Sequence, residues 1–404
     1  MHLNIFAFGV PLFVAFMLLE YYYSLKKGKQ YFRFDEAIAN INVGIAERLT
    51  DLFAAGLFYF IFRWIYEHFA LFTIPENAWT WLLLFVFTDF IWYWYHRFGH
   101  EVNLLWATHV VHHQSEDYNF TVSVRITVLQ AVFRCLFWSF IPAIGFPPHM
   151  IAAMLLIHGI YPFFTHTQVI GRLGVLEYFL VTPSHHRVHH SSNPEYLDKN
   201  YGDVLIIWDK LFGTFAKETV TPVYGLTTPL KSYSFLWQHF HFFLEMGVAF
   251  RRAKGWNARW KIIFGKPDEI DPRIRGFLEK KLLSKHTDLQ PTRALYRYVS
   301  AQTIFTLTAL FFLLLLEQYQ QPFQLIAGAL FLVISIINTG AMLEQKQWIF
   351  DLEYIRFALA GIYIYSFHPT LLTGFVLLIV MGIALTGYRT MSTRYYGLLY
   401  ERSA

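Results

Sequence analysis

Residues 82–100 read LLLFVFTDFIWYWYHRFGH, an apolar run that ends in four aromatic residues and continues into a histidine pair. A transmembrane helix needs about 20 mostly apolar residues, and Trp and Tyr gather at the membrane–water interface. His96 and His100 stand four residues apart, so on a helix their side chains share one face. The stretch therefore predicts a spanning helix, 78–95, with two imidazoles at its end.

Two more histidine clusters follow, and together the three predict a metal centre. The second reads HVVHH from His109 to His113, and the third reads HRVHH from His186 to His190. Both have i, i+3, i+4 spacing, so on a helix each cluster forms one patch of imidazoles. Histidine is the commonest protein metal ligand. Eight imidazoles are too many for one ion and suit two.

The ligand type alone does not name the metal, because imidazole suits iron, copper, nickel and zinc alike. A mononuclear zinc site would need only three or four of these histidines. His100 and Glu101 begin like the zinc-protease motif H-E-x-x-H, but the second histidine is missing, which argues against a protease. A two-metal site that faces lipid favours oxygen activation for attack on a C–H bond, which needs redox-active iron.

The composition of the whole chain favours a membrane protein. Its 404 residues are 55% hydrophobic and 20% aromatic but only 15% charged, whereas soluble domains average about 25% charged residues. The net charge of +5 does not indicate a nucleic-acid partner, because the basic residues lie beside apolar runs, as at a membrane surface. The single cysteine, Cys135, excludes a disulfide framework and a cysteine-based metal site.

Nine apolar segments predict an all-α integral membrane protein with a cytoplasmic, histidine-rich di-metal cap. The first segment lacks the basic start and cleavage site of a signal peptide, so it is expected to stay as an anchor. The turn residues Gly145, Pro147 and Pro148 predict a helical hairpin between the fourth and fifth segments. The segments are 3–24, 51–72, 78–95, 127–146, 149–166, 301–317, 323–343, 353–367 and 369–388.

Basic residues set the expected orientation. Lys26, Lys27 and Lys29 follow the first segment, which predicts that this end faces the cytoplasm. Counting spans onward then places all three histidine clusters on the cytoplasmic side, of either a bacterial inner membrane or the endoplasmic reticulum. The expected parts are N-terminal membrane helices (1–77), a catalytic core (78–230), a cytoplasmic connecting segment (231–300) and C-terminal membrane helices (301–404).

Other polar residues carry weaker signals. His158 is ionisable within a span and so is a functional candidate, whereas His185 is expected to form a hydrogen bond and His149 to lie at the interface. Asp117 or Asp209 is expected either to hold a ligand imidazole or to shape a turn. The histidines without cluster spacing are expected at surfaces or interfaces; they are His68, His239, His241, His286 and His368.

The order H-x3-H, H-x2-H-H, H-x2-H-H resembles the membrane fatty acid hydroxylase and sterol desaturase superfamily, and further stretches resemble its alkylglycerol monooxygenase branch. The apolar block after residue 300 is similar to that branch as well. The stretches are HRFGHEVN at 96–103, SEDYN at 115–119, FTHT at 164–167, TPSHHRVHH at 182–190, KNYG at 199–202, VLIIWDKLFGTF at 204–215 and YGLT at 224–227.

The resemblance implies a di-iron centre that uses dioxygen and a reductant to insert one oxygen atom into a lipid from the bilayer. For this branch it implies tetrahydrobiopterin as the electron donor and hydroxylation of the ether-linked carbon of alkylglycerols, with release of a fatty aldehyde. Glu101 is expected either to bind a metal or to hold a ligand histidine. Pro162 stands where some members have a further histidine. The implied ligands are His96, His100, His109, His112, His113, His166, His186, His189 and His190.

Two alternatives stay open. Within the same class, the enzyme would hydroxylate or desaturate a fatty acyl, sterol or carotenoid chain. From a different class, the chain would be a membrane metal-binding or transport protein, which predicts ionisable residues along several spans. Outside the hairpin, Asp89 is the main residue of that kind.

Overall fold

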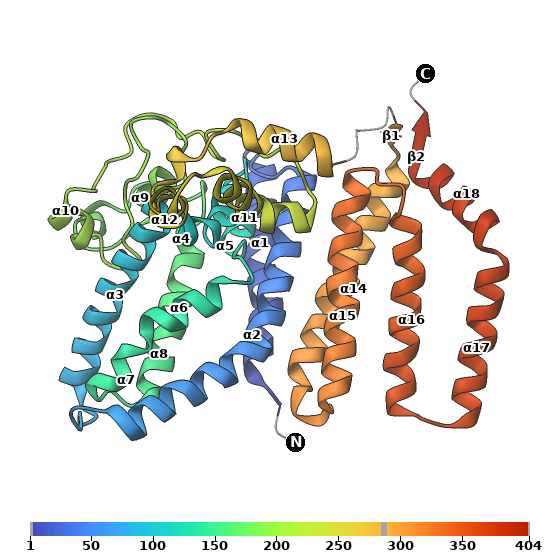
Figure 1. Cartoon of the computed structure of the whole chain (residues 1–404), viewed down its shortest axis with the longest axis horizontal. Helices are drawn as coiled ribbons and strands as arrows, with labels where there is room; N and C mark the ends of the chain where they lie inside the picture. The colour runs from blue at the N-terminus through green and yellow to red at the C-terminus, as the bar shows by residue number, and fades with distance from the viewer. Residues whose placement is uncertain (1–2, 284–288, 403–404) are drawn as a thin grey trace. The chain divides into compact units, whose positions relative to one another are not determined.

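The computed structural model describes residues 3–283 and 289–402, and they are mostly helical, as predicted (Figure 1). The chain divides into two compact units, which are described one at a time. The histidine unit comprises residues 16–231 and 237–279. The C-terminal unit comprises residues 1–15, 232–236 and 280–404, apart from the undescribed positions.

Long helices frame the histidine unit. The helix that carries the first histidine pair begins where Asn77 caps it: the Asn77 Oδ1 accepts from the main-chain N–H groups of Trp79 and Thr80, and Thr80 Oγ1 accepts from the Asn77 N–H. Its 24 residues extend about 36 Å, which is long enough for a bilayer core, but α3 is not among the helices that are apolar enough to count as a span. The long helices are α1 (Gly9–Lys26), α2 (Phe34–Phe69) and α3 (Ala78–Glu101).

The predicted segment 127–146 is two short helices rather than one. The turn that follows them is confirmed, because Gly145 has a φ of +123° and a Cβ there would collide with the main chain of Phe72, so only glycine fits. Beyond the turn, Pro148 starts the next helix at a position that needs no N–H donor. These elements are α6 (Gln130–Trp138), α7 (Phe140–Ile144), α8 (Pro148–Ile160) and η3 (Tyr161–Thr165).

Short helices and loops gather at the upper end of α3 in Figure 1. The second histidine cluster lies on a 3-10 turn, whereas the third begins on a short α-helix whose first position is Pro183. These elements are α4 (Asn103–Ala107), η2 (Val110–His113), α5 (Phe120–Ser123), η4 (Gly174–Tyr178), α9 (Pro183–His189) and α10 (Ile207–Phe212).

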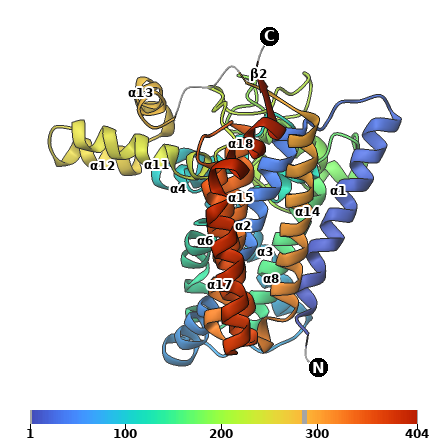
Figure 2. The same ribbon diagram turned by 90° about the vertical axis from the view of Figure 1, so that its right-hand side faces the viewer.

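The segment after the third cluster packs back onto the first two. Gln114 donates from Nε2 to the carbonyl of Gln238 at 2.9 Å, and the Asn103 N–H donates to the carbonyl of Gly265 at 2.9 Å. Figure 2 shows α11 and α12 reaching out to one side of the unit. The helices are α11 (Phe235–Arg252), α12 (Trp256–Phe264), η5 (Pro267–Glu269) and α13 (Arg273–Leu282).

The C-terminal unit is held by a buried carboxylate as well as by apolar packing. Glu353 accepts from Tyr298, Asn338 and Tyr395 at 2.8–3.0 Å, and these residues lie on three other helices. Two short antiparallel strands pair Gln290 with Glu401. The elements are η1 (Ile5–Phe8), β1 (Leu289–Pro291), α14 (Arg293–Leu315), η6 (Glu317–Tyr319), α15 (Pro322–Leu343), α16 (Ile349–Phe367), α17 (Leu371–Thr386), α18 (Tyr388–Leu399) and β2 (Tyr400–Arg402).

The structure supports a multi-pass membrane protein but does not confirm nine spans. Within the described residues, four helices are long and apolar enough to cross a membrane, and the pair α17 and α18, bent by 69°, would make a fifth. Charged residues interrupt α16, and the segment 127–146 is broken near Ser139. The four are Ile5–Lys26, Pro148–Thr165, Arg293–Leu315 and Pro322–Leu343. The count of nine, the four-part division and the cytoplasmic cap stay predictions.

Candidate metal centre

Nine histidines form two groups of converging ring nitrogens. In each group, one nitrogen from every residue lies within 4.8 Å of all the others. They are the nine residues that the resemblance singles out. The five-histidine cluster is His96, His100, His109, His113 and His189; the four-histidine cluster is His112, His166, His186 and His190.

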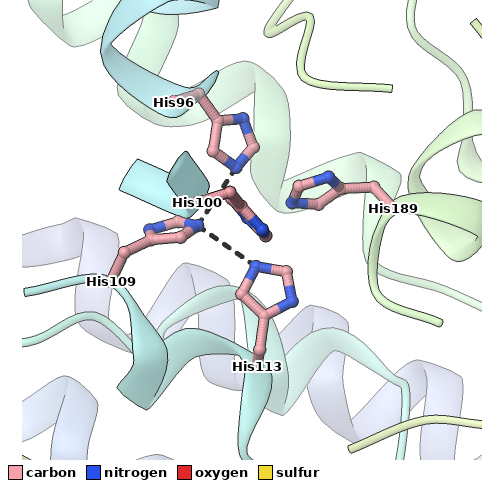
Figure 3. Close-up of side chains that lie close together, drawn as sticks. All are labelled: His96, His100, His109, His113 and His189. Atoms are coloured by element: carbon pink, nitrogen blue, oxygen red, sulfur yellow. Dashed lines mark hydrogen bonds between the residues drawn. The ribbon is translucent and has the colours of Figure 1, made fainter. Parts of the chain in front are cut away.

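The rings of the five-histidine cluster point toward a common centre (Figure 3). The His109 Nε2 lies 3.1 Å from the Nε2 atoms of both His96 and His113. The Nε2 atoms of His100 and His189 are buried and have no hydrogen-bond partner. Because an unsatisfied buried polar atom is costly, these orphaned nitrogens fit a metal ion at the centre.

His166 is the hub of the four-histidine cluster. Its Nε2 lies 3.1 Å from the Nε2 atoms of His112 and His190 and 3.0 Å from that of His186. All four residues are buried, with 8% or less of their surface exposed. The cluster therefore offers several nitrogens around one point that water hardly reaches.

Main-chain carbonyls orient four of the nine rings. A carbonyl oxygen only accepts, so in each pair the imidazole Nδ1 must carry the proton and donate it. This leaves the Nε2 lone pair for a metal, the usual arrangement around a ligand histidine. The pairs are His96 with Tyr201 at 2.9 Å, His112 with Arg125 at 3.1 Å, His166 with Pro162 at 2.6 Å and His189 with Lys199 at 3.0 Å.

Burial keeps the rings neutral. Loss of solvation lowers the pKa of His96 and of His166 to about 4. It lowers the pKa of each of the other seven well below the ordinary value, and repulsion from neighbouring histidines adds to the effect. Neutral imidazole is the form that binds metal. An all-nitrogen donor set fits iron, zinc or copper and not magnesium or calcium, which prefer oxygen.

A third group of side chains, the Asp89 cluster (Asp89, His158 and Asp203), anchors the loop that orients the ligands. Asp89 accepts from the N–H groups of Val204 at 2.9 Å and Leu205 at 3.2 Å, and from Trp208 Nε1 at 2.8 Å. The sequence pointed to Asp89 and His158 as candidates but not to Asp203. The position of Asp203, directly after the KNYG stretch, is the feature that could have indicated it. His158 Nδ1 lies 2.7 Å from Asp203 Oδ2 and 3.6 Å from Asp89 Oδ1.

Asp209 shapes a turn, which was one of the two expectations for it, whereas the contact of Asp117 is long-range, with a residue 84 positions away in the sequence. Asp117 accepts from the N–H and Nε of Arg33 at 2.6 and 2.8 Å, and Asp209 accepts from the N–H groups of Tyr201 and Gly202 at 2.7 Å. Neither of these carboxylates holds a ligand imidazole.

Glu101 lies outside both histidine clusters and accepts from Arg97 Nε at 3.0 Å, so its role in the reaction stays a prediction. His185 lies outside them too. Its Nδ1 accepts from the Thr182 N–H at the start of α9, at 3.3 Å, so the expected hydrogen bond is confirmed.

The expectation for the scattered histidines is partly wrong. His68 and His368 are exposed, and His149 pairs at the surface with Glu76 at 2.9 Å. His239 and His241, in contrast, are buried. His286 lies outside the described residues.

Comparison with known proteins defines the class. Residues 81–214, which contain all nine histidines, match the fatty acid hydroxylase family. Over 95% of its length, the chain is 34% identical to alkylglycerol monooxygenase of Homo sapiens, covering 88% of that protein; for the Danio rerio enzyme the values are 32%, 86% and 79%. The chain belongs to the alkylglycerol monooxygenase family.

A further relative is the ornithine lipid hydroxylase OlsE of Rhizobium tropici, which is 32% identical over 32% of this chain and 40% of its own length. No solved structure matches. The family, the histidine clusters and the apolar helices together support a membrane-embedded lipid monooxygenase, so the predicted resemblance is confirmed. The transport interpretation gains no support.

Proposed function

We propose that this protein is a di-iron monooxygenase that cleaves the ether bond of alkylglycerols, with dioxygen as oxidant and tetrahydrobiopterin as electron donor. The observation that carries the proposal is the pair of histidine clusters in a chain that aligns with alkylglycerol monooxygenase over 95% of its length. The alignment extends beyond the hydroxylase region to the C-terminal helices. It therefore favours the alkylglycerol substrate of that enzyme over the substrates of proteins that share only the hydroxylase region.

The five-histidine cluster would hold one iron and the four-histidine cluster the other. Bound there, iron would supply the activation of dioxygen that attack on a C–H bond requires. The donor set supports iron but also suits other metals, so the choice of iron rests on the chemistry of the family.

The chain's own residues position the donors. The Arg125 guanidinium is buried and donates to the carbonyl of Val111 at 2.6 Å, to Gln114 Oε1 at 2.7 Å and to Asn40 Oδ1 at 2.9 Å. Desolvation lowers the pKa of Arg125 to about 10, so it stays charged at neutral pH. These bonds hold the turn η2, which carries His112 and His113.

In the proposed reaction, one oxygen atom of dioxygen enters the C–H bond of the carbon next to the ether oxygen. The other atom leaves as water, with two electrons and two protons from the donor. The hydroxylated product is a hemiacetal. Its O–H proton moves to the glycerol oxygen as the C–O bond breaks, which gives a fatty aldehyde and glycerol.

We infer further that the clusters face the cytoplasm, in a protein with up to nine spans. Lys26 ends α1, and Lys27 and Lys29 follow it. Basic residues beside a span favour the cytoplasmic side. Labelling engineered cysteines at exposed positions, from either side of sealed vesicles, would test this orientation.

An activity assay tests the reaction. Detergent-purified, iron-loaded protein would receive dioxygen, tetrahydrobiopterin and a long-chain 1-O-alkylglycerol, and fatty aldehyde would be measured over time. Aldehyde is expected only when oxygen and donor are both present. His189→Ala should abolish it, while Arg273→Ala, a change on an exposed side chain that pairs with Asp271, should not. No aldehyde from protein with two irons per chain would contradict the proposal and favour an acyl, sterol or carotenoid substrate.

A further inference from the structure

A cavity of about 400 Å³ lies next to the four-histidine cluster in the histidine unit. Its volume falls within the usual range for small-molecule sites, about 300–1,000 Å³. Among the described residues that line it there is no histidine of either cluster, so the cavity is separate from the metal positions. Its walls include Tyr31, Gln168, Arg172, Arg187, Glu218 and Tyr224.

Two stacked rings join the cavity to the cluster. The Tyr224 ring lies on the Tyr118 ring with centroids 4.7 Å apart and an interplanar angle of 13°. Tyr118, which is fully buried, stacks in turn on His166 at 5.7 Å and 28°, and its centroid lies 5.2 Å from that of His190. The path from the cavity wall to the four-histidine cluster is therefore continuous aromatic contact.

The cavity wall is polar and partly rigid. Arg187 donates from Nε and Nη2 to the two carboxylate oxygens of Glu218, each at 2.8 Å, and from Nη1 to the carbonyls of Thr167 and Ile170. Arg172 donates to the Glu218 carbonyl from an exposed position. The cavity thus combines fixed charges with tyrosine rings, and these features suit a planar molecule with several hydrogen-bonding groups.

We propose that this cavity binds the electron donor of the reaction, a small planar heteroaromatic reductant of the reduced-pterin class. The inference rests on the proposed function, which requires two electrons and two protons for each dioxygen consumed. The donor is oxidised by two electrons and releases two protons, and these accompany one oxygen atom into water.

The same geometry argues against the lipid as occupant. A reacting C–H bond must reach the metal position itself, whereas Tyr118 and Tyr224 stand between the cavity and the cluster. Electrons can be transferred across two stacked rings, whereas an alkyl chain cannot pass through them. The charged wall would also leave its polar groups poorly paired beside an alkyl chain.

Donor binding can be measured without turnover. Metal-loaded, full-length protein in detergent would be equilibrated anaerobically with tetrahydrobiopterin and no lipid, and the Kd would be obtained by equilibrium dialysis. Arg172→Ala and Tyr224→Leu are each expected to raise the Kd at least ten-fold. Arg273→Ala and Tyr178→Leu are matched changes at exposed positions outside the cavity, and they should leave the Kd unchanged.

The outcomes separate this inference from the proposed function. Wild-type protein that makes aldehyde while both cavity variants keep the wild-type Kd would overturn the cavity assignment alone. Cavity variants that raise the KM for alkylglycerol at an unchanged donor Kd would also overturn it, because the cavity would then hold the lipid headgroup. Wild-type protein that binds the donor through Arg172 and Tyr224 but releases no aldehyde would support the cavity and contradict the proposed substrate.

Discussion

Replacing Asp89 by asparagine tests how the ligand-orienting loop is held. Asp89 is fully buried, and its two carboxylate oxygens accept three N–H groups from Val204, Leu205 and Trp208. Asparagine has one carbonyl oxygen, and its amide N–H₂ would face an N–H donor in place of the other carboxylate oxygen. Just before these residues, the loop supplies the carbonyls that orient His189 and His96.

The expected effect is a loss of metal affinity of about 10- to 100-fold. A hydrogen bond to a charged group contributes about 1.5–3 kcal/mol, and a buried N–H left unpaired costs a similar amount. About 1.4 kcal/mol corresponds to a factor of ten in a dissociation constant. The loosened loop would orient His96 and His189 less well, and metal affinity would fall with it. A loss of about 10- to 100-fold is also the usual effect of changing a residue that holds a ligand histidine.

Metal affinity would be measured by competition with a chelator of known affinity, with elemental analysis of the protein fraction. Asp271→Asn is the matched control, since Asp271 pairs with Arg273 at the surface. Circular dichroism would establish that both variants are helical. A folded Asp89→Asn protein with wild-type metal affinity would refute the reasoning, because the carbonyls would then need no anchor in α3.

Three further predictions concern the clusters and their support. His166→Ala removes the hub of the four-histidine cluster and should lower metal content and reduce activity by at least about 100-fold; His149→Ala should retain both, and equal losses would contradict the cluster assignment. Arg125→Leu takes a charged donor away from three buried acceptors and should destabilise the protein by about 3–5 kcal/mol, seen as a lower melting temperature in detergent that Arg273→Leu does not share. Metal-free protein should lose stability as the pH falls from 6.5 to 4. Burial lowers the pKa of His166 from 6.5 to about 4, so in this window the unfolded chain binds a proton that the folded chain does not. For this residue alone, the free energy of unfolding should fall by an amount on the order of 3 kcal/mol. A melting temperature that does not change over this pH window would show that the imidazoles are not buried in the metal-free protein.

The spacing of the histidines identified eight ligand candidates but not how they divide between two sites. Each triplet was expected to act as one patch. Instead His112 and His113 fall into different clusters, as do His189 and His190, because consecutive side chains on a helix point about 100–120° apart. His166 has no cluster spacing at all, and only the family resemblance pointed to it.

Hydropathy located apolar segments well and polar buried ones poorly. The segment 323–343 matches α15 closely, whereas α2 begins at Phe34 and was expected only from residue 51. The missed part of α2 buries polar side chains, among them Asn40, which donates to Thr121 Oγ1 at 2.9 Å. Such a helix is stabilised by hydrogen-bond partners that are distant in sequence, and a search for apolar runs does not detect them.

The division of neighbouring histidines between the clusters has a consequence for how the protein acquires its metals. His112-His113 and His189-His190 each give one side chain to either site, and adjacent Cα atoms are only 3.8 Å apart. An ion captured at one site therefore orders the backbone that carries two ligands of the other. Metal loading should be close to all-or-none, with half-filled molecules scarce even when metal is limiting. A limited metal supply would then lower the fraction of active molecules and leave the activity of each active molecule unchanged.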